Sequence, residues 1–283
     1  SASLVGSEMC IRDRISPARR ERQKMLKLKD VYKTFNRGTV NEKKAIDGLN
    51  LTLADGDFVT VIGGNGAGKS TTLNLIAGVF PVDSGKIVLN GLTLNSLPEH
   101  KRARFLGRVF QDPMRGTAAT MGIEENLALA YRRGKMRGLS YGITNEERKI
   151  YRERLATLGL GLEDRMTSKV GLLSGGQRQA LTLLMATLQK PDLLLLDEHT
   201  AALDPKTADK VLQLTEEIVA RDKLTTLMVT HNMKNAIQYG NRLIMMDAGK
   251  VVVDIRGEEK KNLTVRDLLE KFNIENDRML LSE

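Results

Sequence analysis

The sequence predicts an α/β fold, a mostly parallel β-sheet covered by helices on both faces. Strand-like and helix-like patterns alternate along most of the chain, an order typical of parallel strands joined by helical crossovers. Several strand-like segments, such as DLLLLDE and TTLMVT, are continuous apolar runs, which favours strands buried on both faces. The length of 283 residues suffices for one sizeable core, or for one domain with a subdomain.

The first half of the chain supplies most of the predicted strands. Alternating and β-branched patterns predict strands over residues 26–35, 45–53, 57–64, 86–94 and 107–111. A helix is expected over 69–78, because apolar residues recur at helical spacing and Gly78 is a stop signal. Residues 81–85, PVDSG, are expected to turn. Residues 122–168 are polar and interrupted, and they are expected to be helical without a clear strand.

The second half continues the alternation. A helix begins at Ser174, since apolar residues follow it at helical spacing. Its first turn nevertheless contains Gly175 and Gly176, each of which costs about 1 kcal/mol against Ala inside a helix. The remaining elements are a strand over 192–198, a helix over 205–220 with Pro at its start, a strand over 225–230, a helix over 232–239, a hairpin over 242–255 and a closing helix over about 264–272.

Composition excludes several classes of protein. The formal net charge is +9, but thirteen Lys or Arg against six Asp or Glu lie within residues 101–154. Basic charge confined to one region disfavours an evenly basic nucleic-acid-binding body. No run of eighteen apolar residues occurs, so no membrane-spanning segment is predicted. Cys10 is the only cysteine, which excludes a disulfide framework within one chain and suits a reducing compartment.

Residues 1–24 fit nothing that follows them. The stretch SASLVGSEMCIRDR has no helical or strand period and no signal-peptide pattern, and it resembles the translated read-through of a sequencing adapter. A disordered native tail is the alternative. We therefore expect residues 1–24 to be a non-native or disordered leader and residues 25–283 to form the folded domain, with Met25 as a candidate natural start.

A phosphate-binding loop is the strongest single motif. Residues 63–70, GGNGAGKS, match G-x-x-x-x-G-K-[ST] between a predicted strand and a predicted helix. Glycines let the backbone wrap around phosphate, and the helix N-terminus adds its positive end. Lys69 is expected to reach the β- and γ-phosphates, and Ser70 to bind Mg²⁺. The residues expected to contact ATP here are Gly63, Gly64, Asn65, Gly66, Ala67, Gly68, Lys69, Ser70 and Thr71.

An acidic pair follows a strand of four leucines. Asp197 and Glu198 emerge at the carboxyl end of that strand, where open α/β sheets bind ligands. Asp197 is expected to hold the Mg²⁺ shell, and Glu198 to polarise a water molecule as general base. Capping of a following helix is the alternative for such a pair.

These motifs resemble the ABC-type ATPases. LLSGGQRQ, residues 172–179, is similar to the signature sequence of that family and precedes the LLLLDE strand as it does there. The resemblance covers residues 26 to about 257. In family order the chain carries the phosphate loop, Gln111, Leu173-Ser174-Gly175-Gly176-Gln177, Asp197-Glu198, Ala202-Leu203-Asp204 and His231. The resemblance implies a P-loop fold with an N-terminal antiparallel β subdomain and an inserted helical subdomain over about 112–172.

The resemblance also suggests why the helix at Ser174 begins with glycines. In this family two ATPase domains pair head to tail, and the signature helix of one faces the phosphate loop of the other. Its backbone N–H groups and the Ser174 hydroxyl would approach a γ-phosphate held by the partner. A side chain at Gly175 or Gly176 would obstruct that approach. A simple glycine kink is the alternative.

Four further residues have roles that the resemblance implies. Phe35 is expected to stack on adenine, with a place in the core, or Tyr32 as the platform, as alternatives. Gln111 would help to hold Mg²⁺ and the attacking water. His231 would contact the γ-phosphate as a switch. Asp204 would contact the partner subunit, or alternatively cap the helix that follows it.

One position departs from the family pattern. His199 follows the acidic pair, where the family usually has proline. We expect a structural role for His199, because a position past the acids is not aimed at the phosphate. A role that depends on titration near neutral pH is the alternative.

The function expected from the resemblance is that of an importer motor, which converts ATP and water to ADP and phosphate and couples this to uptake of a small solute. The alternative is a non-transport ABC ATPase of DNA repair, chromosome organisation or translation. A single ATPase domain without sustained heptads or zinc-binding cysteines favours the importer. The solute expected is an amino acid such as tryptophan or tyrosine.

The partners expected are a second copy of this chain, transmembrane permease subunits and an extracytoplasmic solute-binding protein, with no nucleic acid. The cofactors are ATP and Mg²⁺. The place of action is the cytoplasmic face of the cell membrane. The basic segment 101–154 would lie where family members contact their permeases, or form a solvated helical face.

Overall fold

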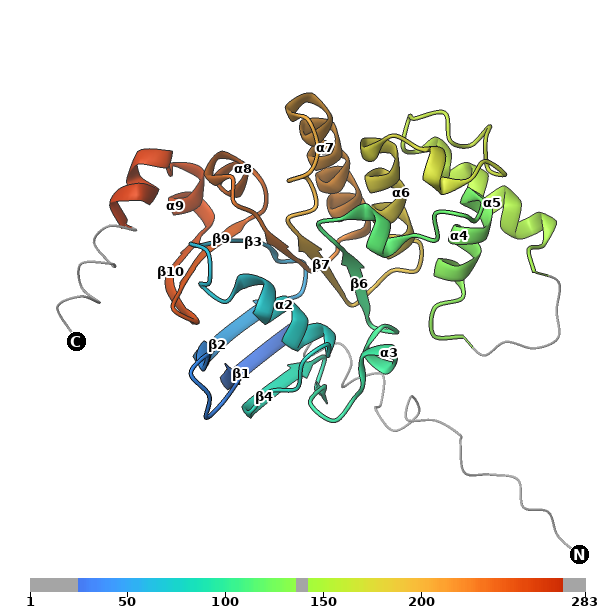
Figure 1. Cartoon of the computed structure of the whole chain (residues 1–283). Coiled ribbons are helices and arrows are strands. Elements are labelled where there is room, and N and C mark those ends of the chain that lie inside the picture. The colour runs from blue at the N-terminus through green and yellow to red at the C-terminus, as the bar shows by residue number, and fades with distance from the viewer. Residues whose placement is uncertain (1–24, 136–141, 272–283) are drawn as a thin grey trace, which may run out of the picture.

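Two β-sheets and a group of helices make up the chain (Figure 1). The structure is a computed structural model, and it describes residues 25–135 and 142–271. The predicted leader, residues 1–24, lies outside the described residues, as does residue 272 at the end of the predicted closing helix; residues 265–271 are helical.

The larger sheet has six strands in the order β10-β9-β3-β8-β7-β6. The strands from β9 to β6 pair in parallel, and β10 pairs antiparallel with β9. Their bounds are β3 Phe58–Ile62, β6 Leu106–Val109, β7 Leu193–Asp197, β8 Thr226–Val229, β9 Arg242–Asp247 and β10 Lys250–Arg256. All residues of β3 and β8 are buried, as expected for central parallel strands covered on both faces.

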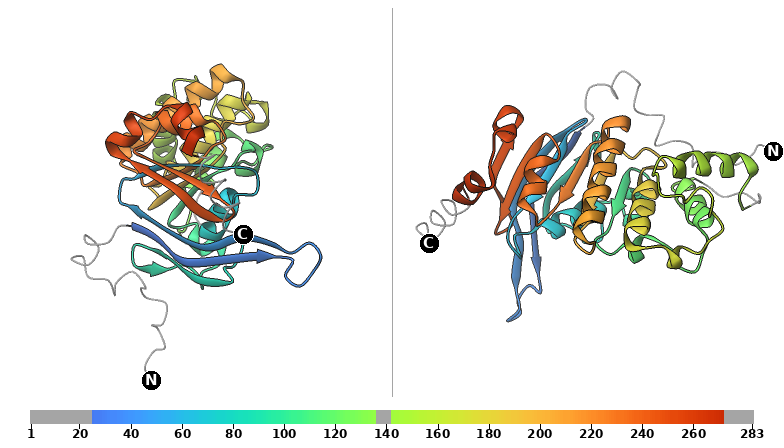
Figure 2. Two further views of the ribbon diagram at one scale, coloured as in Figure 1. Left: turned by 90° about the vertical axis from the view of Figure 1, so that its left-hand side faces the viewer. Right: turned by 90° about the horizontal axis from the view of Figure 1, so that it is seen from above.

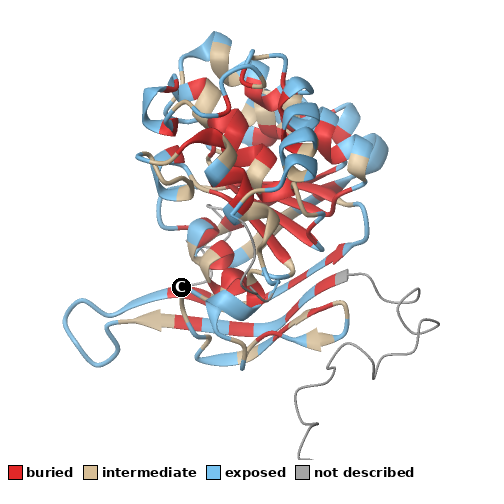
Figure 3. Cartoon of the chain, turned by 90° about the vertical axis from the view of Figure 1, so that its right-hand side faces the viewer, coloured by how far each residue is buried: buried red, intermediate tan, exposed pale blue. Residues whose placement is uncertain are grey.

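The smaller sheet is antiparallel and has the order β2-β1-β4-β5. Its strands are β1 Met25–Phe35, β2 Lys43–Ala54, β4 Ser84–Leu89 and β5 Leu92–Thr93. The hairpin of β1 and β2 extends past the rest of the molecule (Figure 2), and its tip is exposed (Figure 3). The predicted N-terminal antiparallel sheet is therefore confirmed.

Helices cover the larger sheet and fill the space between the two sheets. Their bounds are α2 Lys69–Ala77, α3 Glu99–Arg102, α4 Ile123–Tyr131, α5 Asn145–Ala156, α6 Gly175–Thr187, α7 Pro205–Asp222, α8 Met233–Gln238 and α9 Gly257–Lys261, with 3₁₀ turns at Pro113–Gly116 and Val170–Leu172. Helix α2 lies between the sheets (Figure 1), and its Leu73, Leu75 and Ile76 share one core cluster with strands of both.

A second core cluster stands to one side of the sheets. It joins α4 and α5 to the apolar face of α6, with Tyr151 fully buried at its centre, and Figure 2 shows these helices at the far end of the molecule from α9. Helices α4 and α5 lie between the strand that ends near Gln111 and the signature, where helices were expected. Among the described residues, no helix is both long and apolar enough to cross a bilayer.

One strand prediction is wrong in detail. Residues 86–94 form the hairpin of β4 and β5 rather than a single strand, because Asn90 and Gly91 turn the chain with φ of 51° and 80°. Asn-Gly is the most favoured pair for a two-residue hairpin turn, so the signal was present in the sequence. The other predicted strands and helices are found within a few residues of their expected bounds, and the predicted α/β class is confirmed.

Candidate active site

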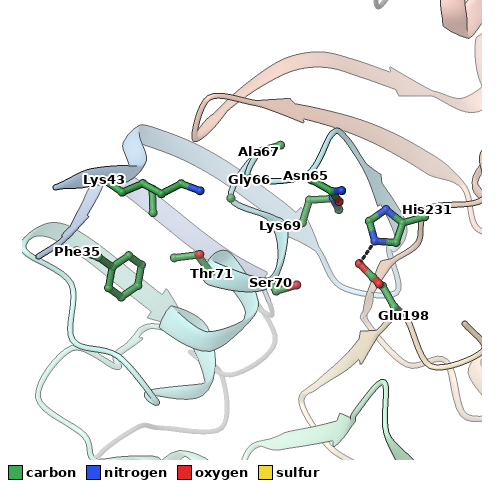
Figure 4. A pocket seen from close by; sticks show the side chains of 12 residues that line it. Phe35, Lys43, Asn65, Gly66, Ala67, Lys69, Ser70, Thr71, Glu198 and His231 are labelled. Carbon is green, nitrogen blue, oxygen red and sulfur yellow. Dashed lines mark ion pairs between the residues drawn. The ribbon is translucent and has the colours of Figure 1, made fainter. Parts of the chain in front are cut away.

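A pocket opens at the carboxyl-terminal edge of the parallel sheet (Figure 4). Loops that leave β3, β7 and β8 meet there, and the facing ends of β1 and β2 close one side. This is the edge at which parallel α/β sheets bind ligands. The lining residues are Phe35, Lys43, Ala45, Asn65, Gly66, Ala67, Gly68, Lys69, Ser70, Thr71, Glu198 and His231.

Two positions of the loop between β3 and α2 accept only glycine. Gly63 has φ 151°, and a Cβ there would lie 2.1 Å from the Met246 carbonyl oxygen. Gly68 has φ 98°, and a Cβ there would lie 2.7 Å from the Ala45 carbonyl oxygen. The loop is therefore pressed against β9 and β2. Because α2 begins at Lys69, the unpaired N–H groups of its first turn lie at the loop.

Lys69 is buried and bound to its own loop. Its Nζ donates to the carbonyl oxygens of Gly63 at 2.8 Å and Gly64 at 2.9 Å. Burial lowers the pKa of the Lys69 ammonium below its usual range, and the nearby carboxylates of Glu198 and Asp197 oppose that shift. The ammonium thus ties the loop to the start of α2.

A hydrogen bond between a hydroxyl and a carboxylate joins α2 to the end of β7. The Ser70 hydroxyl donates to Asp197 Oδ1 at 3.2 Å. Asp197 Oδ2 faces the guanidinium of Arg108 at 3.6 Å, and Arg108 also donates to Asn74 on α2 at 2.7 Å. A hydroxyl and a carboxylate are oxygen ligands of the kind Mg²⁺ prefers, and Mg²⁺ completes its shell with phosphate oxygens and water. The donor set therefore fits Mg²⁺ bound together with a nucleotide.

The most direct contact across the pocket joins Glu198 and His231. Their Oε1 and Nε2 atoms are 2.6 Å apart (Figure 4). Glu198 has φ 47°, a strained value for a non-glycine residue, and its amide donates to the carbonyl of Val229 on β8. Strain of this type is found mainly at functional sites. The Glu198 side chain is 10% exposed and that of His231 is 47% exposed, so solvent reaches the pair from the His231 side.

Phe35 lies on the opposite wall of the pocket. Its ring packs edge-on against Phe80, with the two ring centroids 5.1 Å apart. The Lys33 ammonium lies over the Phe35 ring, 5.5 Å from its centroid. One face of this pocket is thus aromatic. Tyr32, the alternative platform, is not among the lining residues and instead borders a separate depression with Asp30 and Asp47.

Some predicted site residues do not line this pocket. Gln111 is exposed beyond the end of β6, and the signature residues 173–177 and Asp204 lie on and before other helices. Asp204 is the N-cap of α7, accepting from the Thr207 amide at 3.1 Å, so its capping alternative is realised. The sequence reasoning missed Lys43, Ala45 and Arg108. Arg108 alone had a signal, as a charge inside an apolar strand.

Comparison with known proteins identifies the family of the chain. Residues 46–201 match the family described as ABC transporter. The chain belongs to this family. It is therefore an ATP-binding cassette with an ABC-type ATPase site, as the motifs predicted.

This cassette is similar over its length to named uptake ATPases. It is 46% identical to the tyrosine transport ATP-binding protein of Clostridioides difficile (strain R20291), over 88% of this chain and 98% of that protein. It is 35% identical to the methionine import ATP-binding protein MetN of Rhizobium johnstonii, over 81% of this chain and 60% of that protein. These names favour the importer over the non-transport alternative.

Solved cassettes have the same fold. A bacterial ABC transporter cassette in a dimeric structure matches with a TM-score of 0.70 at 32% identity, over 82% of this chain and 98% of that one. The same values hold for a dimeric cassette in a post-hydrolysis state bound to ADP and phosphate.

The signature helix of the cassette begins with a reciprocal cap. The Ser174 hydroxyl accepts from the Gln177 amide at 3.3 Å, and the Gln177 side chain accepts from the Ser174 amide at 3.2 Å. This capping box compensates part of the cost of Gly175 and Gly176. Gly175 is exposed, whereas Gly176 is buried, and a Cβ there would lie 2.2 Å from Thr207 Cγ2 on α7. Packing within the chain is therefore one sufficient reason for the second glycine, a reason that the sequence did not reveal.

Replacing Gly176 by Ala is expected to lower the free energy of unfolding by about 1–2 kcal/mol, because the overpacking cost exceeds the gain in helix propensity. Thr207 cannot rotate its methyl away freely, since β-branched side chains are stiff at χ1. The additional change Thr207→Ser removes Cγ2 and should restore stability. Gly175→Ala is the matched control, because its Cβ would lie 3.3 Å from the flexible Leu203 side chain. Denaturant unfolding measures the free energy of unfolding of the parent, of Gly176→Ala with and without Thr207→Ser, and of Gly175→Ala. Equal stability of Gly176→Ala and the double variant would contradict the packing explanation.

His199 is structural in the described chain. Its side chain is 1% exposed, and Nε2 lies 3.1 Å from Thr215 Oγ1. The Thr215 hydroxyl already donates to the Val211 carbonyl, so His199 Nε2–H is the donor. Burial lowers the pKa of His199 to about 4. The expected structural role is thereby supported over a role in titration near neutral pH.

The buried imidazole predicts acid sensitivity. The folded pKa of about 4 lies below the ordinary value of 6.5, so between these pH values the unfolded chain binds a proton that the folded chain does not. The contribution of His199 to stability is therefore complete above pH 6.5 and decreases as the pH falls toward 4, by roughly 3 kcal/mol in total. His199→Gln, which cannot titrate, should show a flatter dependence of unfolding free energy on pH. Parallel pH profiles for the two proteins would contradict this prediction.

Proposed function

We propose that this chain is the ATP-hydrolysing subunit of an importer for tyrosine or a chemically similar aromatic amino acid. The observation that carries the proposal is the 46% identity to a tyrosine transport ATP-binding protein over 98% of that protein. Relatives named for spermidine and putrescine or for methionine are 33% and 35% identical. The pocket is shaped for a nucleotide, so the choice of solute rests on this relationship alone.

In the proposed site ATP lies along the pocket with its adenine on Phe35 and its phosphates in the loop 63–68. The loop amides and the first turn of α2 would bind phosphate oxygens. Lys69 would exchange its hydrogen bonds to Gly63 and Gly64 for the β- and γ-phosphates, a short movement for an ammonium already at the loop. The hydrogen bonds from Lys69 restrict the loop, which reduces the ordering cost of binding.

Ser70 and Asp197 are the proposed Mg²⁺ ligands, with Gln111, which does not line the pocket, as a proposed further ligand. Bound Mg²⁺ would neutralise charge that develops on the β- and γ-oxygens. Arg108 would orient the Asp197 carboxylate, since it faces the oxygen that Ser70 does not use.

Glu198 is the proposed general base and His231 the proposed γ-phosphate contact. The two side chains pair with each other through Glu198 Oε1. A carboxylate has about four acceptor sites on its two oxygens, so Glu198 can accept from His231 and from an attacking water at the same time. The pair would therefore hold the base in place, and His231, half exposed on the pocket side, would lie within reach of the γ-phosphate.

The proposed assembly contains two copies of this chain, permease subunits and a binding protein on the opposite side of the membrane, with this chain at the cytoplasmic face. Leu173, Ser174, Gly175, Gly176 and Gln177 would complete the partner's site, and Asp204 would lie at the same interface. The dimeric form of a similar cassette, seen in two of its structures, supports this arrangement.

The test is transport in a reconstituted system. The chain is reconstituted in vesicles with candidate permease subunits, with a candidate binding protein on the opposite side of the membrane and ATP on the side of this chain. Uptake of labelled tyrosine is expected with the parent chain and not with Glu198→Gln, and labelled methionine and spermidine serve as competing solutes. Uptake of another class of solute would refute the tyrosine assignment, and ATP hydrolysis that never drives uptake would refute the importer.

A further inference from the structure

The nucleotide pocket contains a second cation, Lys43, that belongs to none of the motifs. Lys43 is the first residue of β2 and pairs in register with Phe35 of β1. Both side chains line the pocket. Figure 4 shows the Lys43 side chain extending past Phe35 toward the tip of the phosphate loop.

The Lys43 ammonium lies close to the loop itself. A Cβ placed on Gly66 would be 3.2 Å from Lys43 Nζ, so the cation stands over the loop with no side chain between them. Gly66 has φ 88°, a conformation that favours glycine. The open backbone at Gly66 therefore leaves room for the ammonium.

Within the part of the chain that the structure describes, Lys43 differs from the neighbouring lysines in having no acidic partner. Lys44 pairs with Asp47 at 2.7 Å, and Lys33 pairs with Asp83 at 2.9 Å. Among residues 25–135 and 142–271, no carboxylate lies within 4.0 Å of the Lys43 ammonium. Successive residues of a strand face opposite sides, which explains why Lys43 and Ala45 line the pocket while Lys44 does not.

The position of the Lys43 ammonium determines which phosphates of a bound nucleotide it can contact. Lys69 is anchored at Gly63 and Gly64 and faces Glu198 and Asp197, the end of the pocket at which the γ-phosphate is cleaved. Lys43 stands at the other end, beside the aromatic wall. A nucleotide that spans the pocket from Phe35 to Lys69 places its α- and β-phosphates nearest to Lys43.

We propose that Lys43 is a second phosphate-binding cation of this site, which contacts the α- and β-phosphates that ATP and ADP share. The inference rests on the assignment of the pocket as the nucleotide site. Its consequence is that Lys43 strengthens binding of both nucleotides equally, and does not favour ATP over ADP. This separates its role from that of Lys69.

The test compares Lys43→Gln with Lys44→Gln, an adjacent exposed lysine that does not line the pocket. Calorimetry measures the Kd of the full chain for ATP and for ADP at low and moderate salt. Lys43→Gln should weaken both by a similar factor of about three to ten at low salt, and by less at higher salt because screening already reduces the contribution of an exposed cation. Lys43→Arg should retain most of the affinity, and Lys44→Gln should match the parent.

Each other outcome overturns the proposal. Unchanged affinities in Lys43→Gln, or equal losses in Lys44→Gln, would show that the cation at 43 has no specific role. A loss confined to ATP would move the contact to the γ-phosphate. Failure of the pocket assignment is seen separately, because Lys69→Ala would then bind ATP as well as the parent. Thermal unfolding without nucleotide confirms that each variant is folded.

Discussion

Replacing Glu198 by Gln is expected to lower the rate of ATP hydrolysis by at least about a hundredfold, because general-base catalysis typically contributes a factor of 10² to 10⁴. The amide has the size and polarity of the carboxylate, but it cannot accept the proton of the attacking water. ATP binding should survive, since Lys69, the loop amides and Phe35 are unchanged. The measurements are steady-state phosphate release and calorimetric ATP affinity.

The same substitution should also change the oligomeric state. When hydrolysis no longer separates the two subunits, dimers should accumulate in the presence of ATP, and size-exclusion chromatography would detect them. Glu217→Gln, at an exposed position of α7, is the matched control and should behave as the parent. If Glu198→Gln turned over ATP at the parental rate, the base would have to be another group, and His231, 2.6 Å away, would be the next candidate.

Replacing Lys69 by Ala is expected to weaken ATP binding by roughly ten- to a hundredfold, the range for losing hydrogen bonds between a cation and a charged ligand. The structure adds a second reason. Lys69 donates to two carbonyls of the loop, so its removal also frees the loop to adopt other shapes. Lys69→Met retains the apolar stem without the charge and should lose ATP affinity as well. Affinity within about threefold of the parent would contradict the assignment.

A mixture of two inactive proteins tests the shared site. Gly175→Asp places a negative charge in the first turn of α6, where it suits the helix but would repel a partner's γ-phosphate. A twofold dimer has two such sites. In a dimer of Gly175→Asp and Lys69→Ala chains, one interface carries both defects and the other carries neither, so activity should return on mixing. A mixture that stays inactive although mixed dimers form would speak against completion of the site by a partner.

The parts of the fold that sequence predicts well are those governed by local rules. The strand 192–198 is an uninterrupted apolar run, and the Asp247–Lys250 turn follows hairpin chemistry; both occur as expected. The phosphate loop is recognisable from sequence because its backbone conformation requires glycine at fixed positions. Gly63 and Gly68 have positive φ and leave no room for a Cβ. The turn at Asn90-Gly91 follows an equally local rule.

The parts that sequence could not predict depend on contacts between distant segments. Position 176 must be glycine because of Thr207, which lies 31 positions further along the chain and on another helix. Lys43 is an ordinary strand lysine until the fold places it over Gly66. Periodicity and motif spacing describe a residue's own segment, and they contain no information about which side chain from elsewhere will fill the space beside it.

The contact between Gly176 and Thr207 also has a mechanical consequence. With no room for even one methyl group between the first turns of α6 and α7, neither helix start can shift toward the other, and Asp204 is tied to the same turn through the Thr207 amide. The signature and the segment around Asp204 are therefore in direct contact. In the proposed dimer, a displacement that pushes the start of one helix toward the other would have to move both.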